Sequence, residues 1–112
     1  MQSKKETFHV KHYVRIHYQV PELGGELLNI AELEEINSER CTMVRMIELD
    51  PEETITGVFV DGRVIGQANE PMPAVPHPDS YDAIEGITAV KLTRMEFEGL
   101  WGEAKVKFPE IG

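Results

Sequence analysis

Residues 58–104 constrain the fold of this chain more than any other segment, because they combine a tight hairpin with one amphipathic helix. The dipeptide Asp61-Gly62 joins two short apolar runs, and this pair is a strong signal for a two-residue β-hairpin turn. A turn of that length sets apolar side chains opposite each other across the two strands, Val58 with Ile65 and Phe59 with Val64.

A helix is predicted to begin after Thr93. Glu96 follows three residues later and completes a capping box, in which each side chain binds the backbone N–H of the other residue. Four apolar side chains then recur at the spacing of one helix face: Phe97, Leu100, Trp101 and Ala104. We therefore expect this face to pack against a sheet.

Strand patterns fill most of the remaining chain. Residues 8–20 alternate between apolar and polar side chains, as a strand with one wet face does. Residues 40–49 are apolar on both faces, which indicates an interior strand. The other predicted strands are residues 26–35, 55–60, 63–68 and 87–92. We also expect Asp79 or Ser80 to cap a single helical turn.

These elements predict an α+β fold, in which a mostly antiparallel sheet of about five or six strands carries one C-terminal helix on a face. At 112 residues the chain is long enough for one modest core. We expect residues 1–112 to form a single domain, with flexible ends at 1–7 and 107–112.

Four prolines, Pro71, Pro73, Pro76 and Pro78, stiffen the segment between the hairpin and the last strand. We call residues 71–78 the proline arm and expect it to be an extended connector laid over the sheet. Pro73 and Pro76 also match a Pro-x-x-Pro ligand, but this spacing has little specificity.

The composition excludes several classes of protein. A net charge of −9 argues against direct nucleic-acid binding, which needs clustered Lys and Arg. The longest apolar runs are far below the roughly 18 residues of a membrane span, and no signal peptide follows the first lysines. The single cysteine, Cys41, forms no intrachain disulfide and is expected as a small buried hydrophobe. A cytoplasmic protein is the default expectation.

No catalytic, cofactor-binding or metal-binding set stands out in the sequence. His9 and His17 share one strand face but lie roughly 26 Å apart at the strand rise, and His12 faces the other way. A histidine metal site therefore requires distant segments, including His77 on the proline arm, to converge. We expect no bound metal and no cofactor.

Two polar groups are candidates for function. Glu32, Glu34 and Glu35 are expected on a charged strand edge, where they form a partner surface, or less commonly an acid/base pair. Arg45 alternates along its strand with the same parity as Cys41, Met43, Ile47 and Leu49, so these side chains are expected on one face of the strand. The Arg45 guanidinium is therefore expected to point into an apolar face and to pair with Glu32 or Glu34. An anion-binding arginine in a cleft is the alternative.

Residues 28–104 resemble a family of small uncharacterised bacterial domains of unknown function. The resemblance rests on the order of several pieces. They are the acidic residues 31–35, Arg40 with Val44-Arg45, Ile47-Glu48-Leu49, the Asp61-Gly62-Arg63 hairpin, the proline arm, and the helix with Glu96-Phe97, Leu100-Trp101 and Ala104. The long first strand and the extra residues 51–54 depart from that pattern. The resemblance implies a compact α+β domain and supplies no activity. Similar small acidic domains often accompany toxin systems as immunity proteins, which is an analogy.

Three functions remain open from the sequence. The first is a small acidic protein-binding domain, immunity-like or a regulatory inhibitor, whose partner is a basic protein. The second is a small-molecule-binding domain or minor enzyme, with Arg45, Glu48 and His12 in a pocket between the sheet and the proline arm. The third is a homodimer formed through an uncovered edge of the long first strand. The lack of a catalytic set favours a non-enzymatic role.

Overall fold

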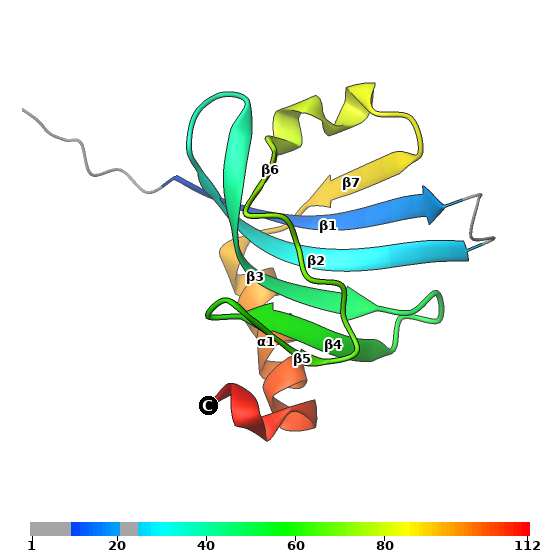
Figure 1. Ribbon diagram of the computed structural model, residues 1–112, viewed down its shortest axis with the longest axis vertical. Helices are drawn as coiled ribbons and strands as arrows, with labels where there is room; N and C mark the ends of the chain where they lie inside the picture. Colours follow the sequence, from blue (N-terminus) through cyan, green and yellow to red (C-terminus); the bar gives the residue numbers. More distant parts are fainter. Residues whose placement is uncertain (1–9, 21–24) are drawn as a thin grey trace, which may run out of the picture.

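The fold is built on one antiparallel sheet, and one α-helix crosses one face of this sheet (Figure 1). The computed structural model describes residues 10–20 and 25–112. Five strands follow the predicted order: β1 (Lys11–Val20), β2 (Gly25–Glu35), β3 (Arg40–Leu49), β4 (Ile55–Val60) and β5 (Arg63–Gly66). The later elements are β6 (Ala74–Pro76), the 3-10 helix η3 (Pro78–Ala83), β7 (Ile87–Lys91), α1 (Arg94–Lys107) and the 3-10 helix η4 (Pro109–Ile111).

The sheet runs in the order β5-β4-β3-β2-β1-β7, and β6 pairs with β3 beside this path. The predicted α+β class is confirmed. The sheet has seven strands, because part of the proline arm joins it as β6. The N-terminal part of the first predicted strand, residues 8–9, lies outside the described residues.

The Asp61-Gly62 turn has the conformation that its sequence predicts. Asp61 has φ 52° and Gly62 has φ 76°, as both central residues of a type I′ turn require. The turn sets Val58 opposite Ile65 and Phe59 opposite Val64, so both predicted pairs are confirmed.

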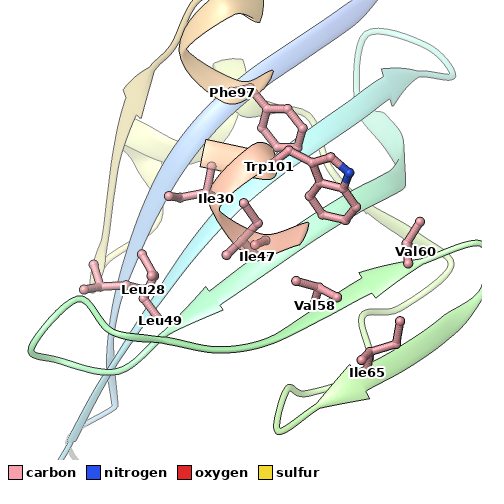
Figure 2. Packing of buried hydrophobic residues seen from close by; sticks show 10 residues of the cluster. Leu28, Ile30, Ile47, Leu49, Val58, Val60, Ile65, Phe97 and Trp101 are labelled. Atoms are coloured by element: carbon pink, nitrogen blue, oxygen red, sulfur yellow. The ribbon is translucent and has the colours of Figure 1, made fainter. Parts of the chain in front are cut away.

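The helix α1 covers one face of the sheet (Figure 2). Its capping box forms as predicted, since Thr93 Oγ1 accepts from the Glu96 N–H and the Glu96 carboxylate accepts from the Thr93 N–H. Phe97, Trp101 and Ala104 are buried. They pack on side chains from four strands: Leu28, Ile30, Ile47, Leu49, Val58, Val60 and Ile65.

A β-bulge in β3 decides which side chains reach this face. Glu32 of β2 pairs with Arg45, but the next residue, Leu33, pairs with Met43, so Val44 is the extra residue. The expected common parity of Arg45 with Cys41 and Met43 is therefore wrong. Cys41 and Met43 belong to the core on the opposite face, because the bulge reverses the alternation between them and Arg45.

The second face has its own buried core, built on Val14, Ile16, Ala31, Leu33, Cys41, Met43 and Met46. The proline arm and η3 cover it, through Val75 and Tyr81. The Tyr81 hydroxyl donates to the Pro76 carbonyl at 3.0 Å, which ties η3 to β6. The cap of η3 is His77, not the expected Asp79 or Ser80, because the His77 ring accepts from the Asp79 N–H.

Two expectations about edges and ends are wrong. The first strand is not an uncovered edge, because β7 pairs with β1 from Val14 to Tyr18 and β2 pairs with its other side. Residues 107–112 are not a loose end, since α1 runs to Lys107 and both Phe108 and Ile111 pack against the helix-side core. Residues 1–7 lie outside the described part of the chain.

Within residues 10–20 and 25–112, no helix has the length and apolar character needed to cross a membrane.

Candidate functional site

A groove of about 540 Å³ lies between the start of the proline arm and the sheet, and we call it the arm groove. Its walls come from β2, β3, β4, the hairpin turn and the arm: Glu34, Thr42, Met43, Val44, Phe59, Asp61, Gly62, Glu70, Pro71, Met72 and Pro73. The predicted hollow between the sheet and the proline arm is therefore present. Its polar groups, however, are not the ones that the sequence indicated.

The arm groove forms where one edge of β3 changes its partner. Residues Arg45 to Leu49 of β3 pair with β4, and residues Arg40 to Thr42 of the same edge pair with β6. The chain leaves this edge at the hairpin and returns to it along the proline arm. The groove is thus fixed on both sides by backbone hydrogen bonds to a single strand.

The arm groove combines carboxylates with an apolar surface. Glu34, Asp61 and Glu70 line it, and none of the described residues in its lining carries a positive charge. Met43 is buried and Phe59 is half-buried in its floor, whereas Met72 is 72% exposed.

The three acidic residues of β2 do not form the expected exposed edge. Strand β2 is interior, between β1 and β3. Glu32 is buried, with 2% of its surface exposed, so its place in a partner surface is contradicted. Glu34 is half-buried and lines the arm groove, while Glu35 contacts two histidines. Alternation along β2 places Glu35 on the opposite face of the strand from Glu32, so the three carboxylates do not form one surface.

Arg45 forms the buried ion pair that the sequence predicts. Its Nε donates to Glu32 Oε1 at 2.5 Å, and its two terminal nitrogens donate to Glu98 of α1 at 3.3 and 2.8 Å. Lys11 and the Tyr13 hydroxyl also donate to Glu32. The arginine therefore joins the sheet to the helix, and each of its three nitrogens donates to a carboxylate.

Aromatic rings and charge both hold this guanidinium. Its Cζ lies 4.8 Å from the ring centroid of Phe97 and 5.0 Å from that of Trp101, within cation–π range. Burial lowers the pKa of Arg45, but the hydrogen bonds that it donates to Glu32 and Glu98 raise it overall. Burial likewise raises the pKa of Glu32, and its contacts with Arg45 and Lys11 outweigh burial and hold it below its ordinary value.

The predicted pocket groups, Arg45, Glu48 and His12, are not brought together. Arg45 lies beneath α1, as described above. Glu48 is buried at the other end of β3, where its carboxylate accepts from the Asn69 backbone N–H at 2.9 Å. His12 lies near the start of β1 and contacts Glu35. Each of the three groups serves a different part of the fold.

A second cluster lies where β1, the end of β2, the start of β3 and the proline arm meet. His12 Nε2 is 2.9 Å and His77 Nε2 is 2.8 Å from the same atom, Glu35 Oε1. The metal-binding atoms of His12, Cys41 and His77 lie within 4.8 Å of one another. The distant segments that the sequence analysis named as a requirement for a histidine site do converge here.

The cluster is largely closed to solvent. Cys41 is 0% exposed and the His77 side chain 5%, whereas those of His12 and Glu35 are 19% and 31% exposed. Hydrogen bonds to His12 and His77 lower the pKa of Glu35. Burial, with the nearby charges of Glu35 and Asp79, raises the pKa of the Cys41 thiol to about 11. At neutral pH the thiol is therefore protonated and a poor nucleophile.

Sequence reasoning missed Asp61 and Glu70 in the groove and Cys41 in the second cluster. It named His77 but did not predict that His77 approaches His12. Asp61 was explained by the turn alone, and Cys41 by its apolar neighbours. The pairing of β6 with β3 places Val75 opposite Cys41, which brings His77 to this end of the sheet. No local pattern in the sequence predicts that pairing.

Comparisons with protein-family models, with curated proteins and with solved structures found no match to this chain.

Proposed function

We propose that this chain is a small acidic protein-binding domain, immunity-like or a regulatory inhibitor, that holds a basic protein at the arm groove. The observation that carries the proposal is the lining of this groove, which combines the carboxylates of Glu34, Asp61 and Glu70 with apolar side chains. A basic segment with one or two apolar side chains complements such a surface in both charge and shape.

Charge supports the proposal both before the two proteins meet and after they are in contact. The net charge of −9 attracts a basic partner before contact, and this attraction weakens as salt screens it. The groove carboxylates then act at contact, where opposite charges fix the register of the partner and reject acidic chains.

Apolar surface supports the proposal as well, because charge alone gives little affinity in water. Met72 stands 72% exposed beside the half-buried Phe59. Methionine adapts its shape to different partners, and both residue types are enriched where protein interfaces are buried. We expect Met72 to be the residue of the proline arm that a partner covers most completely.

Two sets of substitutions test the site. The groove set is Glu34→Gln, Asp61→Asn and Glu70→Gln, and the control set is Glu52→Gln, Glu103→Gln and Glu110→Gln, at exposed positions away from the groove. Both sets remove the same number of charges. Asparagine is chosen at position 61 because it tolerates the positive φ found there. Both proteins must melt like the parent.

The tagged parent, groove and control proteins are incubated with lysate of the native host at low salt. A retained basic protein is then purified and titrated with each of them. We expect the parent and control proteins to bind it, and the groove set to lose at least tenfold in affinity. Release by a wash of about 0.5 M salt is expected as well. Equal loss in both sets, or none in either, would contradict the proposed surface.

A small cationic ligand is the second candidate, since a volume of about 540 Å³ is ordinary for a ligand pocket. Here the polar groups would be Glu34, Asp61 and Glu70 in place of the trio that the sequence indicated. A panel of small diamines and guanidinium compounds, read by thermal shift on the parent and groove proteins, tests this candidate. A rise in melting temperature confined to the parent would favour it over the protein partner.

A further inference from the structure

We propose that His12, Cys41 and His77, with Glu35 as the fourth ligand, form a binding site for a zinc-type divalent metal ion that fastens the proline arm to the sheet. The site is independent of the arm groove and of the protein partner proposed above. None of its four residues lines that groove.

The donor atoms already converge. One ring nitrogen each of His12 and His77 and the Sγ of Cys41 lie within 4.8 Å of one another. A point centred in a triangle with sides of that length is about 2.8 Å from each corner, whereas zinc needs about 2.0–2.3 Å. Each donor must therefore move inward by less than about 1 Å, which rotation of the side chains supplies.

The chemistry of the donors suits zinc. One thiolate, two imidazoles and one carboxylate are all ligand types that zinc accepts in tetrahedral sites. Binding of the ion displaces the proton of the Cys41 thiol into solvent. The charges then balance, because a divalent ion with the Cys41 thiolate and the Glu35 carboxylate sums to zero. Neutrality matters here, since Cys41 and His77 are almost fully buried and an unbalanced buried charge is costly.

Glu35 is the natural fourth ligand. Its Oε1 already accepts hydrogen bonds from both imidazole Nε2 atoms, at 2.9 and 2.8 Å. An ion placed between these nitrogens replaces the two hydrogen bonds with coordination to the same oxygen. Four protein ligands leave no open position for substrate, so the arrangement is that of a structural site.

The backbone holds the four ligands on separate but connected elements. The Glu35 N–H donates to the Val10 carbonyl at 2.8 Å, and Glu35 pairs with Cys41 across β2 and β3. The His77 N–H donates to the Glu39 carbonyl at 2.9 Å, which fixes the end of the proline arm beside them. Ligands on such a frame need little reorganisation when an ion binds.

The second nitrogen of His77 also has partners. Nδ1 accepts from the Asp79 N–H at 3.1 Å, which places the ring proton on Nε2, facing Glu35. When Nε2 binds an ion, the proton must move to Nδ1. Nδ1 then no longer accepts from the Asp79 N–H, so this cap of η3 is lost. The Asp79 carboxylate, 3.7 Å from Nδ1, becomes the acceptor of the ring proton, as in the carboxylate–histidine–zinc arrangement of many metal sites.

Cobalt(II) provides the direct test, because a cobalt–thiolate bond gives a near-ultraviolet charge-transfer band and tetrahedral cobalt gives strong visible bands. The full chain is reduced, freed of metal with a chelator and titrated with Co²⁺. We expect both sets of bands to saturate at one ion per chain, and added Zn²⁺ to abolish them. Zinc alone is expected to raise the unfolding temperature.

The variants are His12→Gln and His77→Gln, with His17→Gln as the matched control. His17 lies on the same strand as His12 but contacts Glu26, away from the cluster. Loss of an outer-shell partner costs roughly 10–100-fold in affinity, so loss of a ligand should cost about 100-fold or more. We expect this loss in both cluster variants and an unchanged affinity in the control.

His12 is half-buried, so its variant is expected to fold even if His77→Gln does not. Absence of the charge-transfer band from the parent would overturn the proposal, as would cobalt affinity that is the same in His12→Gln and His17→Gln. In either case Glu35 links the two histidines by hydrogen bonds alone. These results do not depend on the groove variants, so the two proposals can fail separately.

Discussion

Arg45 of β3 and Glu98 of α1 lie 53 residues apart in the chain, yet two hydrogen bonds of 3.3 and 2.8 Å join their side chains. With the bond from Arg45 to the buried Glu32, they connect the helix to the centre of the sheet. These hydrogen bonds require a defined distance and direction between the side chains, whereas apolar contacts between α1 and the sheet tolerate small shifts of the helix. The hydrogen bonds therefore fix the position of the helix along the strands.

Replacing Arg45 should destabilise the protein strongly. The change Arg45→Met keeps much of the apolar contact with Phe97 and Trp101 but leaves Glu32 buried with only Lys11 as a cationic partner. Breaking a buried pair costs about 3–5 kcal/mol, and we expect about 3 kcal/mol because Lys11 remains. Urea unfolding at neutral pH measures the cost. The control Arg40→Met, at an exposed position of the same strand, should change stability little.

The same network makes stability depend on pH in the acid range. Contacts with Arg45 hold the pKa of Glu98 below its ordinary value, and contacts with Arg45 and Lys11 do so for Glu32 against the opposing effect of burial. The folded state therefore binds fewer protons than the unfolded state. Its stabilisation is complete above the ordinary carboxyl pKa of about 4.3 and is lost as pH falls through the lower folded values.

We expect the free energy of unfolding to decrease steadily between about pH 5 and pH 3 in the parent. The decrease should be shallower in Arg45→Met, where both carboxylates lose the partner that lowers their pKa. Urea titrations at several pH values give both slopes. Parallel slopes would show that other carboxylates dominate the acid dependence.

Trp101 should be essential for docking of the helix. Its indole is stacked on Phe97 with ring centroids 6.0 Å apart, and it belongs to the helix-side core together with Val58 and Val60. Truncation of a large buried aromatic residue costs about 3–5 kcal/mol, which we expect for Trp101→Ala. On the same helix, Met95 is 85% exposed, so Met95→Ala should stay within about 0.5 kcal/mol. A Trp101→Ala protein that melts like the parent would contradict this role.

Two glycines should respond in opposite directions to alanine. A Cβ at Gly57 would lie 2.6 Å from the backbone carbon and oxygen of Gln67, which cannot move aside as a flexible side chain can. We expect Gly57→Ala to cost about 1–3 kcal/mol through overpacking. Gly99, inside α1, has no such neighbour within 4 Å. Gly99→Ala should raise stability by up to about 1 kcal/mol, and thermal melts of both variants test the pair.

Local signals predicted most of the fold. The Asp61-Gly62 turn and the Thr93 capping box depend on residues a few positions apart, so the sequence determines them directly. The stripe of Phe97 and Trp101 likewise follows from helix periodicity. The insertion of Val44 as a bulge has no such signal, because Met43 and Val44 are both apolar and either parity is plausible. One extra residue then moved Cys41 to the other face.

The candidate sites were harder to predict because they depend on non-local pairing. The sequence predicts either Glu32 or Glu34 as the partner of Arg45, since these residues lie on neighbouring strands of one predicted hairpin, and the structure has Glu32. The approach of His77 to His12 instead depends on how the proline arm returns to β3. Pairing of a three-residue strand across such a separation is set by tertiary packing, and short apolar runs do not specify it.

The return of the proline arm to β3 has a consequence for binding. Backbone pairing holds β4 and β6 to the same strand, so folding alone anchors to β3 the strands that flank the arm groove. The chain has lost the conformational entropy of those two strands before a partner arrives, which lowers the ordering cost of binding. Recognition at such a surface should resemble the docking of two rigid bodies, with its selectivity set by fit.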